Sequence, residues 1–118
     1  MTSRPPRLAH KISNIWTANP TLDYELAQEK ASALGRLGRG LEAALGALRA
    51  FDASIIEPSA ETRRERSARV AHAGHALWLF VVQREAIGLR DSRQVMRDYG
   101  VPADVQGRMG MLPLKPSR

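Results

Sequence analysis

Residues 76–82 read Ala-Leu-Trp-Leu-Phe-Val-Val and form the longest uninterrupted apolar run in the chain. Successive side chains of an α-helix are rotated by about 100°, so a run of this length leaves no side of the helix for water. Such a helix has to be covered on every side. The run is too short to cross a membrane, which takes about 20 apolar residues. We therefore expect the rest of the chain to be arranged around this segment.

The composition indicates one all-α domain. The chain has 118 residues, of which 43% are hydrophobic and 25% charged, as is usual for a globular protein. Aromatic residues make up only 5%, so the core has to be built from Leu, Val and Ala, a mixture that suits helices better than sheets. There is no cysteine, which excludes disulfides, thiolate metal sites and cysteine nucleophiles and fits a reducing, cytoplasmic setting.

The sequence divides into a basic N-terminal arm (1–19), a helical domain (20–110) and an extended C-terminal tail (111–118). The arm contains Arg4, Arg7 and Lys11 and no acidic residue. It is compatible with an organelle transit peptide. We favour an arm that lies across the domain or a partner, with Trp16 as its anchor.

A first long helix is predicted over 20–51, with Asn19 as its cap and Pro20 at the first helical position. From Leu34 onward its leucines recur every three or four residues, the spacing of a coiled-coil seam. Four glycines interrupt this helix, and they indicate either a kink or the close approach of another helix. We favour close packing, because the leucine pattern continues across them.

A second long helix is predicted from the cap Ser59 to a stop at Gly88. The connection before it, 52–59, has a length that suits an antiparallel return. Arg84 falls on the line of the helix's inner apolar residues, where it would need a carboxylate partner. A strand over 77–82 is the alternative, but it would stand alone between two helical patterns. Two short helices follow, one over 91–99 with an Asp91/Gln94 capping box and one over 103–109.

Two long helices share only one interface and cannot surround residues 76–82 by themselves. We therefore expect two long antiparallel helices and two short C-terminal helices that complete a four-helix-type bundle as a symmetric homodimer. The candidate core and dimer-interface residues are Leu34, Leu37, Leu41, Leu45, Leu77, Trp78, Phe80 and Val81.

Candidate chemistry is sparse. His72 and His75 lie three residues apart, a spacing that can share a metal ion, but no third ligand is evident and structural or interfacial histidines are the better interpretation. No motif for nucleophilic or acid–base catalysis is present. We expect a non-enzymatic interaction or scaffold protein without metal or cofactor. A small apolar ligand beside Trp78 is a weaker alternative.

Nucleic-acid binding is the main alternative function. The net charge is +6, with fifteen Arg against three Lys, and arginine is suited to phosphate contacts. Residues 93–109 partly resemble a helix-turn-helix around Gly100, although a plain helical hairpin capping the core fits better. The candidate contacts are Arg63, Arg64, Arg66, Arg69, Arg93, Arg97 and Arg108.

Three segments, 24–39, 83–91 and 99–102, resemble a family of small uncharacterised helical bacterial proteins. They read Tyr-Glu-Leu-Ala-Gln-Glu-Lys-Ala-Ser-Ala-Leu-Gly-Arg-Leu-Gly-Arg, Gln-Arg-Glu-Ala-Ile-Gly-Leu-Arg-Asp and Tyr-Gly-Val-Pro. The resemblance extends over most of 22–110. It implies an all-helical fold and a bacterial cytosolic setting, and it implies no activity and no site residue.

Overall fold

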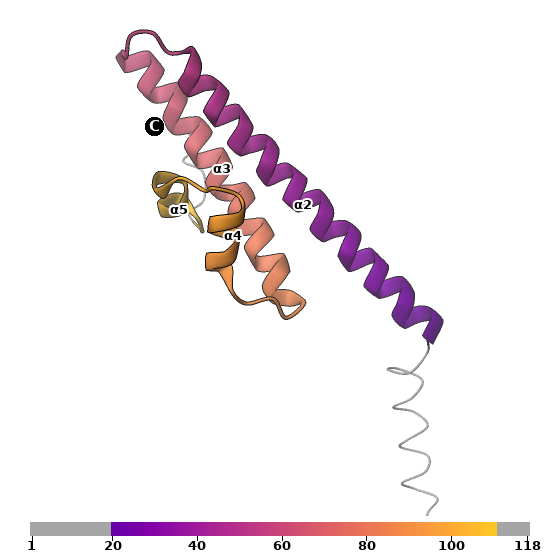
Figure 1. Cartoon of the computed structure of the whole chain (residues 1–118). Helices are drawn as coiled ribbons and strands as arrows, with labels where there is room; N and C mark the ends of the chain where they lie inside the picture. Colours follow the sequence, from indigo (N-terminus) through magenta and orange to yellow (C-terminus); the bar gives the residue numbers. More distant parts are fainter. Residues whose placement is uncertain (1–19, 111–118) are drawn as a thin grey trace, which may run out of the picture. The chain divides into compact units, whose positions relative to one another are not determined.

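The computed structural model describes residues 20–110, which form four α-helices and contain no strand. The predicted all-α fold of two long and two short helices is confirmed (Figure 1). The predicted arm and tail lie outside the described residues. None of the helices in this part of the chain is long and apolar enough to span a membrane. The helices are α2 (Pro20–Ser54), α3 (Ala60–Ala86), α4 (Ser92–Asp98) and α5 (Ala103–Arg108).

The chain divides into two compact units, residues 1–32 and 33–118. The described part of the first unit, 20–32, is the beginning of α2. The helix starts at Pro20, as predicted, and Asp23 lies in its first turn, where a negative charge complements the helix dipole. Every residue of this segment is exposed, Tyr24 by 64% and Leu26 by 49%.

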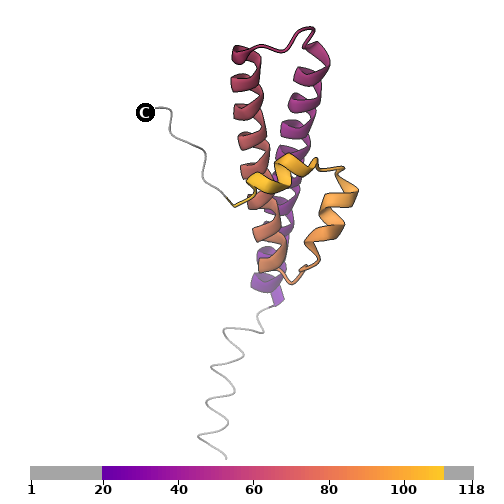
Figure 2. The same cartoon turned by 90° about the vertical axis from the view of Figure 1, so that its left-hand side faces the viewer.

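In the second unit, the remainder of α2 and the whole of α3 form an antiparallel helical hairpin (Figures 1 and 2). The core lies between these two helices and the short helices packed on them. Each large core side chain contributes roughly 1.5–3 kcal/mol on full burial. The buried apolar residues are Leu41, Ala44, Leu45, Leu48, Val70, Ala73, Leu77, Phe80, Val81, Val95, Val101 and Val105.

Ser59 caps the N-terminus of α3, as predicted. Its hydroxyl accepts a hydrogen bond from the Thr62 backbone N–H at 3.1 Å. In return, the Thr62 hydroxyl accepts one from the Ser59 N–H at 2.8 Å. Two N–H groups that the first helical turn leaves without partners are thereby satisfied, and Glu61 adds a negative charge in the same turn.

The predicted stops at Gly88 and Gly100 are present. Both residues have positive φ, 95° and 59°, a conformation that glycine adopts without a Cβ clash. The predicted capping box at Asp91 is wrong. The Asp91 side chain forms no cap hydrogen bond, and the Gln94 N–H binds the Asp91 main-chain carbonyl instead, at 3.3 Å.

Two glycines allow the short C-terminal helices to reach the hairpin. A Cβ added at Gly74 would lie 2.8 Å from the Cβ of Arg108, so α5 rests directly on the backbone of α3. One added at Gly38 would lie 3.0 Å from the Tyr99 hydroxyl, and the Tyr99 ring also packs edge-on against Phe80. The predicted close packing at glycines therefore holds for Gly38 within α2.

The prediction of close packing does not hold for Gly40 and Gly46, where an added Cβ would meet nothing within 4 Å. The expectation that Arg84 has a carboxylate partner is also wrong. Its Nε is buried without a hydrogen bond, and its guanidinium lies over the Phe80 ring at 5.8 Å from the centroid. A cation over an aromatic face compensates part of the missing interaction.

We expect Gly74→Ala to lower the free energy of unfolding by about 1–3 kcal/mol, because the new methyl group forces α5 off α3. The matched control is Gly40→Ala, which places the same methyl group in open space. It should raise stability by up to about 1 kcal/mol through helix propensity. Urea denaturation of both variants measures the difference. Equal shifts in the same direction would contradict the role of Gly74.

Candidate interaction surface

The side of α3 that faces away from the core carries an exposed apolar surface. Residues 71–83 contain no Asp, Glu, Lys or Arg. Three of their large side chains remain partly in water: Trp78 is 39% exposed, Leu79 36% and Val82 42%. A helix face of this kind normally carries charged residues. The outer face of α3, as we call it, consists of Ala68, His72, His75, Trp78, Leu79, Val82 and Ala86.

Helical spacing explains why this face is separate from the core. Leu77, Phe80 and Val81 point toward α2 and the short helices and are buried. Leu79 and Val82 lie within the same run but on the opposite side of the helix. The apolar run thus contributes to two surfaces, only one of which is covered by the described part of the chain.

Trp78 lies at the rim of the outer face and is held in place by two neighbours. The His75 ring stacks on it with 6.2 Å between centroids and 26° between planes. Gly110 is also near the ring, because a Cβ added there would lie 3.5 Å from the indole Cδ1. These contacts fix the indole at the surface, where its amphipathic ring is suited to an interface.

The predicted core and interface residues occupy different places. Leu41, Leu45, Leu77, Phe80 and Val81 are buried in the core of a single chain. Leu34 and Leu37 are partly buried and pack against that core, and Trp78 alone of the eight predicted residues is exposed. Sequence reasoning missed Leu79 and Val82. The signal that could have found them is helical spacing, because both lie on the side of the helix opposite the predicted inner line through Arg84.

The two histidines offer no metal site. His72 is exposed, His75 is half-buried against Trp78, and the described residues contain no group of three potential ligands. Two imidazoles alone do not complete the usual four-coordinate site.

Arg66, one of the predicted nucleic-acid contacts, forms an ion-pair cluster instead. Its Nε and Nη2 donate hydrogen bonds to the Asp52 carboxylate at 2.7 and 3.2 Å, and its Nη1 donates one to Asp104 at 2.8 Å. These bonds join the end of α2, the start of α3 and the start of α5. They raise the pKa of Arg66, with the hydrogen bond to Asp52 as the largest cause. The Arg66 hydrogen bond lowers the pKa of Asp104 below its usual value.

The other predicted arginine contacts lie in different surroundings. The Arg69 guanidinium lies 4.4 Å above the Phe51 ring centroid, where it stabilises the hairpin through a cation–π contact. Arg108 is half-buried against Gly74. The remaining four are exposed, on the first turns of α3 and on α4: Arg63, Arg64, Arg93 and Arg97.

Residues 93–109 do form two short helices joined by a turn, but the second is poorly placed to read bases. α5 has six residues, and its Val105 is fully buried in the core. The Gln106 side-chain amide donates a hydrogen bond to the Val101 carbonyl at 3.0 Å. The negative Asp104 lies at its start. The predicted helical hairpin that caps the core therefore describes this segment well.

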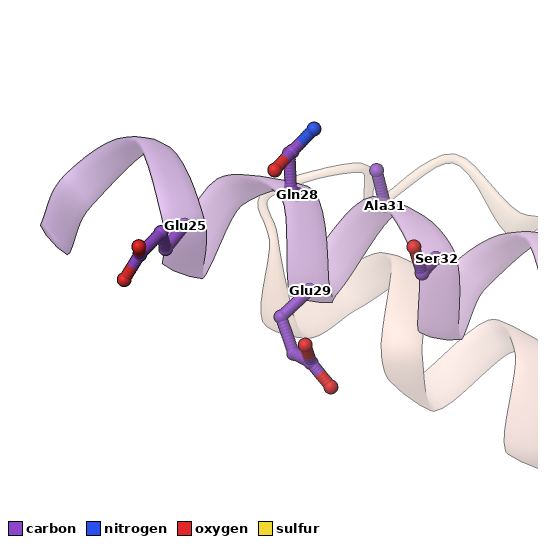
Figure 3. A pocket seen from close by; sticks show the side chains of 5 residues that line it. All are labelled: Glu25, Gln28, Glu29, Ala31 and Ser32. Carbon is purple, nitrogen blue, oxygen red and sulfur yellow. The ribbon is translucent and has the colours of Figure 1, made fainter. Parts of the chain in front are cut away.

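The surface hollows of the described residues do not form a closed binding site. One of about 620 Å³ is lined by Glu25, Gln28, Glu29, Ala31 and Ser32, all exposed and all on α2. Figure 3 shows that their side chains point in different directions instead of converging on one point. Another, of about 380 Å³, is lined partly by Arg63, Arg66 and Arg108 beside Asp104. Because Arg66 is already paired with two carboxylates, this hollow is a weak anion site.

A family of unknown function, DUF6665, matches residues 12–117, and the chain belongs to this family. The resemblance to uncharacterised helical proteins is thereby confirmed. No curated protein and no solved structure matches the chain. The family carries no activity that could be transferred to particular residues.

The Arg66 cluster leads to a pH prediction. The pKa of Asp104 is lower in the folded state, so its contribution to stability is present above the unfolded value of about 4 and is lost as the pH falls through the folded value. Because both groups are partly exposed, solvent screening limits this contribution to at most about 1 kcal/mol. We expect Asp104→Asn to destabilise the protein at pH 7, and the difference from the wild type to shrink below about pH 4.

Urea denaturation at a series of pH values measures this difference. Asp98→Asn is the control, because Asp98 is exposed and forms no ion pair among residues 20–110. A stability difference for Asp104→Asn that stays constant from neutral to acidic pH would show that the ion pair does not contribute.

Proposed function

We propose that this member of the DUF6665 family is a non-enzymatic, cytoplasmic interaction module that acts as a homodimer through the outer face of α3. The observation that carries the proposal is the partial exposure of Trp78, Leu79 and Val82 on a helix segment without charges. Contiguous apolar surface in the middle of a helix is typical of protein–protein contacts. Aromatic residues such as Trp78 are also enriched at such contacts.

The same face argues against alternatives that need a closed cavity. Trp78 lies at the surface with its ring against His75, which suits a flat contact better than a small-molecule pocket. Arg66, whose side chain is bound to Asp52 and Asp104, joins helices and is not available to a substrate. This arrangement supports a binding function without catalysis.

The proposal predicts a dimer in solution. Size-exclusion chromatography with light scattering should give about twice the 13.0 kDa of one chain, and Leu79→Glu should give the monomer mass. A carboxylate placed in this apolar contact loses much of its hydration, which weakens association.

The matched control is Ile56→Glu, which changes an equally apolar side chain that is 92% exposed in the loop between α2 and α3. This variant should remain dimeric. Circular dichroism confirms that both variants are folded. A wild-type monomer at micromolar concentration, or an unchanged dimer in Leu79→Glu, would refute self-association through this face.

Nucleic-acid binding remains the rival proposal, supported by the exposed Arg63 and Arg64 on the first turns of α3 and by the exposed Arg93 and Arg97 on α4. If it is correct, the protein is retained on heparin or duplex DNA in a salt-dependent manner, and Arg63→Ala with Arg64→Ala reduces the slope of log affinity against log salt by up to about two. Arg93→Ala with Arg97→Ala, on α4, tests the same charge change elsewhere. No retention at low salt would remove the rival.

A further inference from the structure

We infer that the outer face of α3 is covered by the same face of a second copy, with the two α3 helices running antiparallel. This inference rests on the proposed function and specifies its partner and geometry. It concerns the residues between Ala68 and Ala86, which are all described and lie on one α-helix.

The sizes of the side chains favour a symmetric contact. Along the centre of the face, residues recur every three or four positions, the spacing of a helix–helix seam. Alanine stands at both ends and the large apolar residues lie near the middle. In an antiparallel pair, Ala68 of one copy then lies beside Ala86 of the other, and the larger residues pair between them, His72 with Val82 and His75 with Leu79. The residues of this seam are Ala68, His72, His75, Leu79, Val82 and Ala86.

The charged residues that precede the seam favour an antiparallel over a parallel pair of α3 helices. N-terminal to Ala68 the same side of the helix continues with Arg64 and Glu61, both exposed. In a parallel pair each of these would lie beside its own copy, so that like charges repel. In an antiparallel pair centred near Leu77 they lie beyond the end of the partner's α3, which stops at Ala86. The helix dipoles then also oppose one another, which is favourable.

The described residues of the second unit, 33–110, leave this face open. α5 lies against a different side of α3, at Gly74, and the core lies against Leu77 and Phe80. Trp78 stands at the rim, between the seam and Gly110. A second copy would therefore bury Leu79 and Val82 at the centre of the contact and the indole of Trp78 at its edge. Neutral, self-complementary surfaces of this kind suit a two-fold contact.

Cysteine cross-linking tests the direction, because the chain contains no cysteine of its own. Ala68→Cys and Ala86→Cys are made as separate variants, mixed, allowed to exchange subunits, and treated with a short bis-maleimide. The antiparallel pair predicts a covalent dimer in the mixture. It predicts none with either variant alone, since each cysteine lies about 27 Å along the helix axis from its own copy. Cross-linking of each single variant with itself would show a parallel pair and overturn the inference.

Two controls keep the outcomes distinct. Leu79→Cys lies near the centre of the contact and should cross-link with itself, whereas Ala50→Cys on the exposed side of α2 should not. If light scattering shows a dimer but the Ala68→Cys and Ala86→Cys mixture does not cross-link, only the antiparallel arrangement is wrong. If light scattering shows a monomer and Leu79→Cys also fails to cross-link, the proposed function fails with it.

Discussion

The rest of the structure depends on how α3 is covered. Over residues 71–83 this helix carries no charged side chain, so each of its sides is more favourable in contact with protein than with water. One side is covered by leucines of α2, among them Leu41 and Leu45, and by Val95, Val101 and Val105 from the C-terminal segment. The side with Leu79 and Val82 remains partly in water. The described part of one chain thus covers only one side of α3.

The short helices α4 and α5 complete the cover of the inner side of α3, and a small number of residues hold these two helices in place. Gly74 lets the backbone of α5 approach α3, and Gly38 does the same for the Tyr99 ring beside α2. Arg66 joins Asp52 and Asp104 across three helices. The arginines that a sequence-based view assigns to phosphate contacts are thus partly used inside the fold. Arg66 and Arg69 both bind residues of α2, whereas Arg63 and Arg64 remain exposed on α3.

Much of the fold could be predicted from local signals, because those signals act within a few residues. The Ser59 cap and the glycine stops at Gly88 and Gly100 are of this kind. Contacts between distant segments could not be predicted. No local sequence signal marks Gly74, because its role depends on Arg108, a residue far away in the sequence that packs against it in the folded chain.

The candidate surface shows the same limit in another form. Periodicity identifies a helix face only where apolar and polar residues alternate, and residues 76–82 are apolar throughout. The sequence predicts that this helix needs cover on all sides, and the inner line on which Leu77, Phe80 and Arg84 fall already separates Leu77 and Phe80 from Leu79 and Val82. That Leu79 and Val82 remain partly in water requires the structure. The predicted Asp91 capping box is absent, and the Gln94 N–H binds the Asp91 backbone carbonyl instead of its side chain.

The central claim is that association covers the outer face of α3, and the solvent exposure of Trp78 as a function of protein concentration tests it most directly. The chain has two tryptophans, so Trp16→Phe leaves Trp78 as the only indole. Acrylamide quenching of its fluorescence should fall as the concentration rises from nanomolar to high micromolar, because a second copy shields the ring. Quenching that stays the same over this range would contradict the claim.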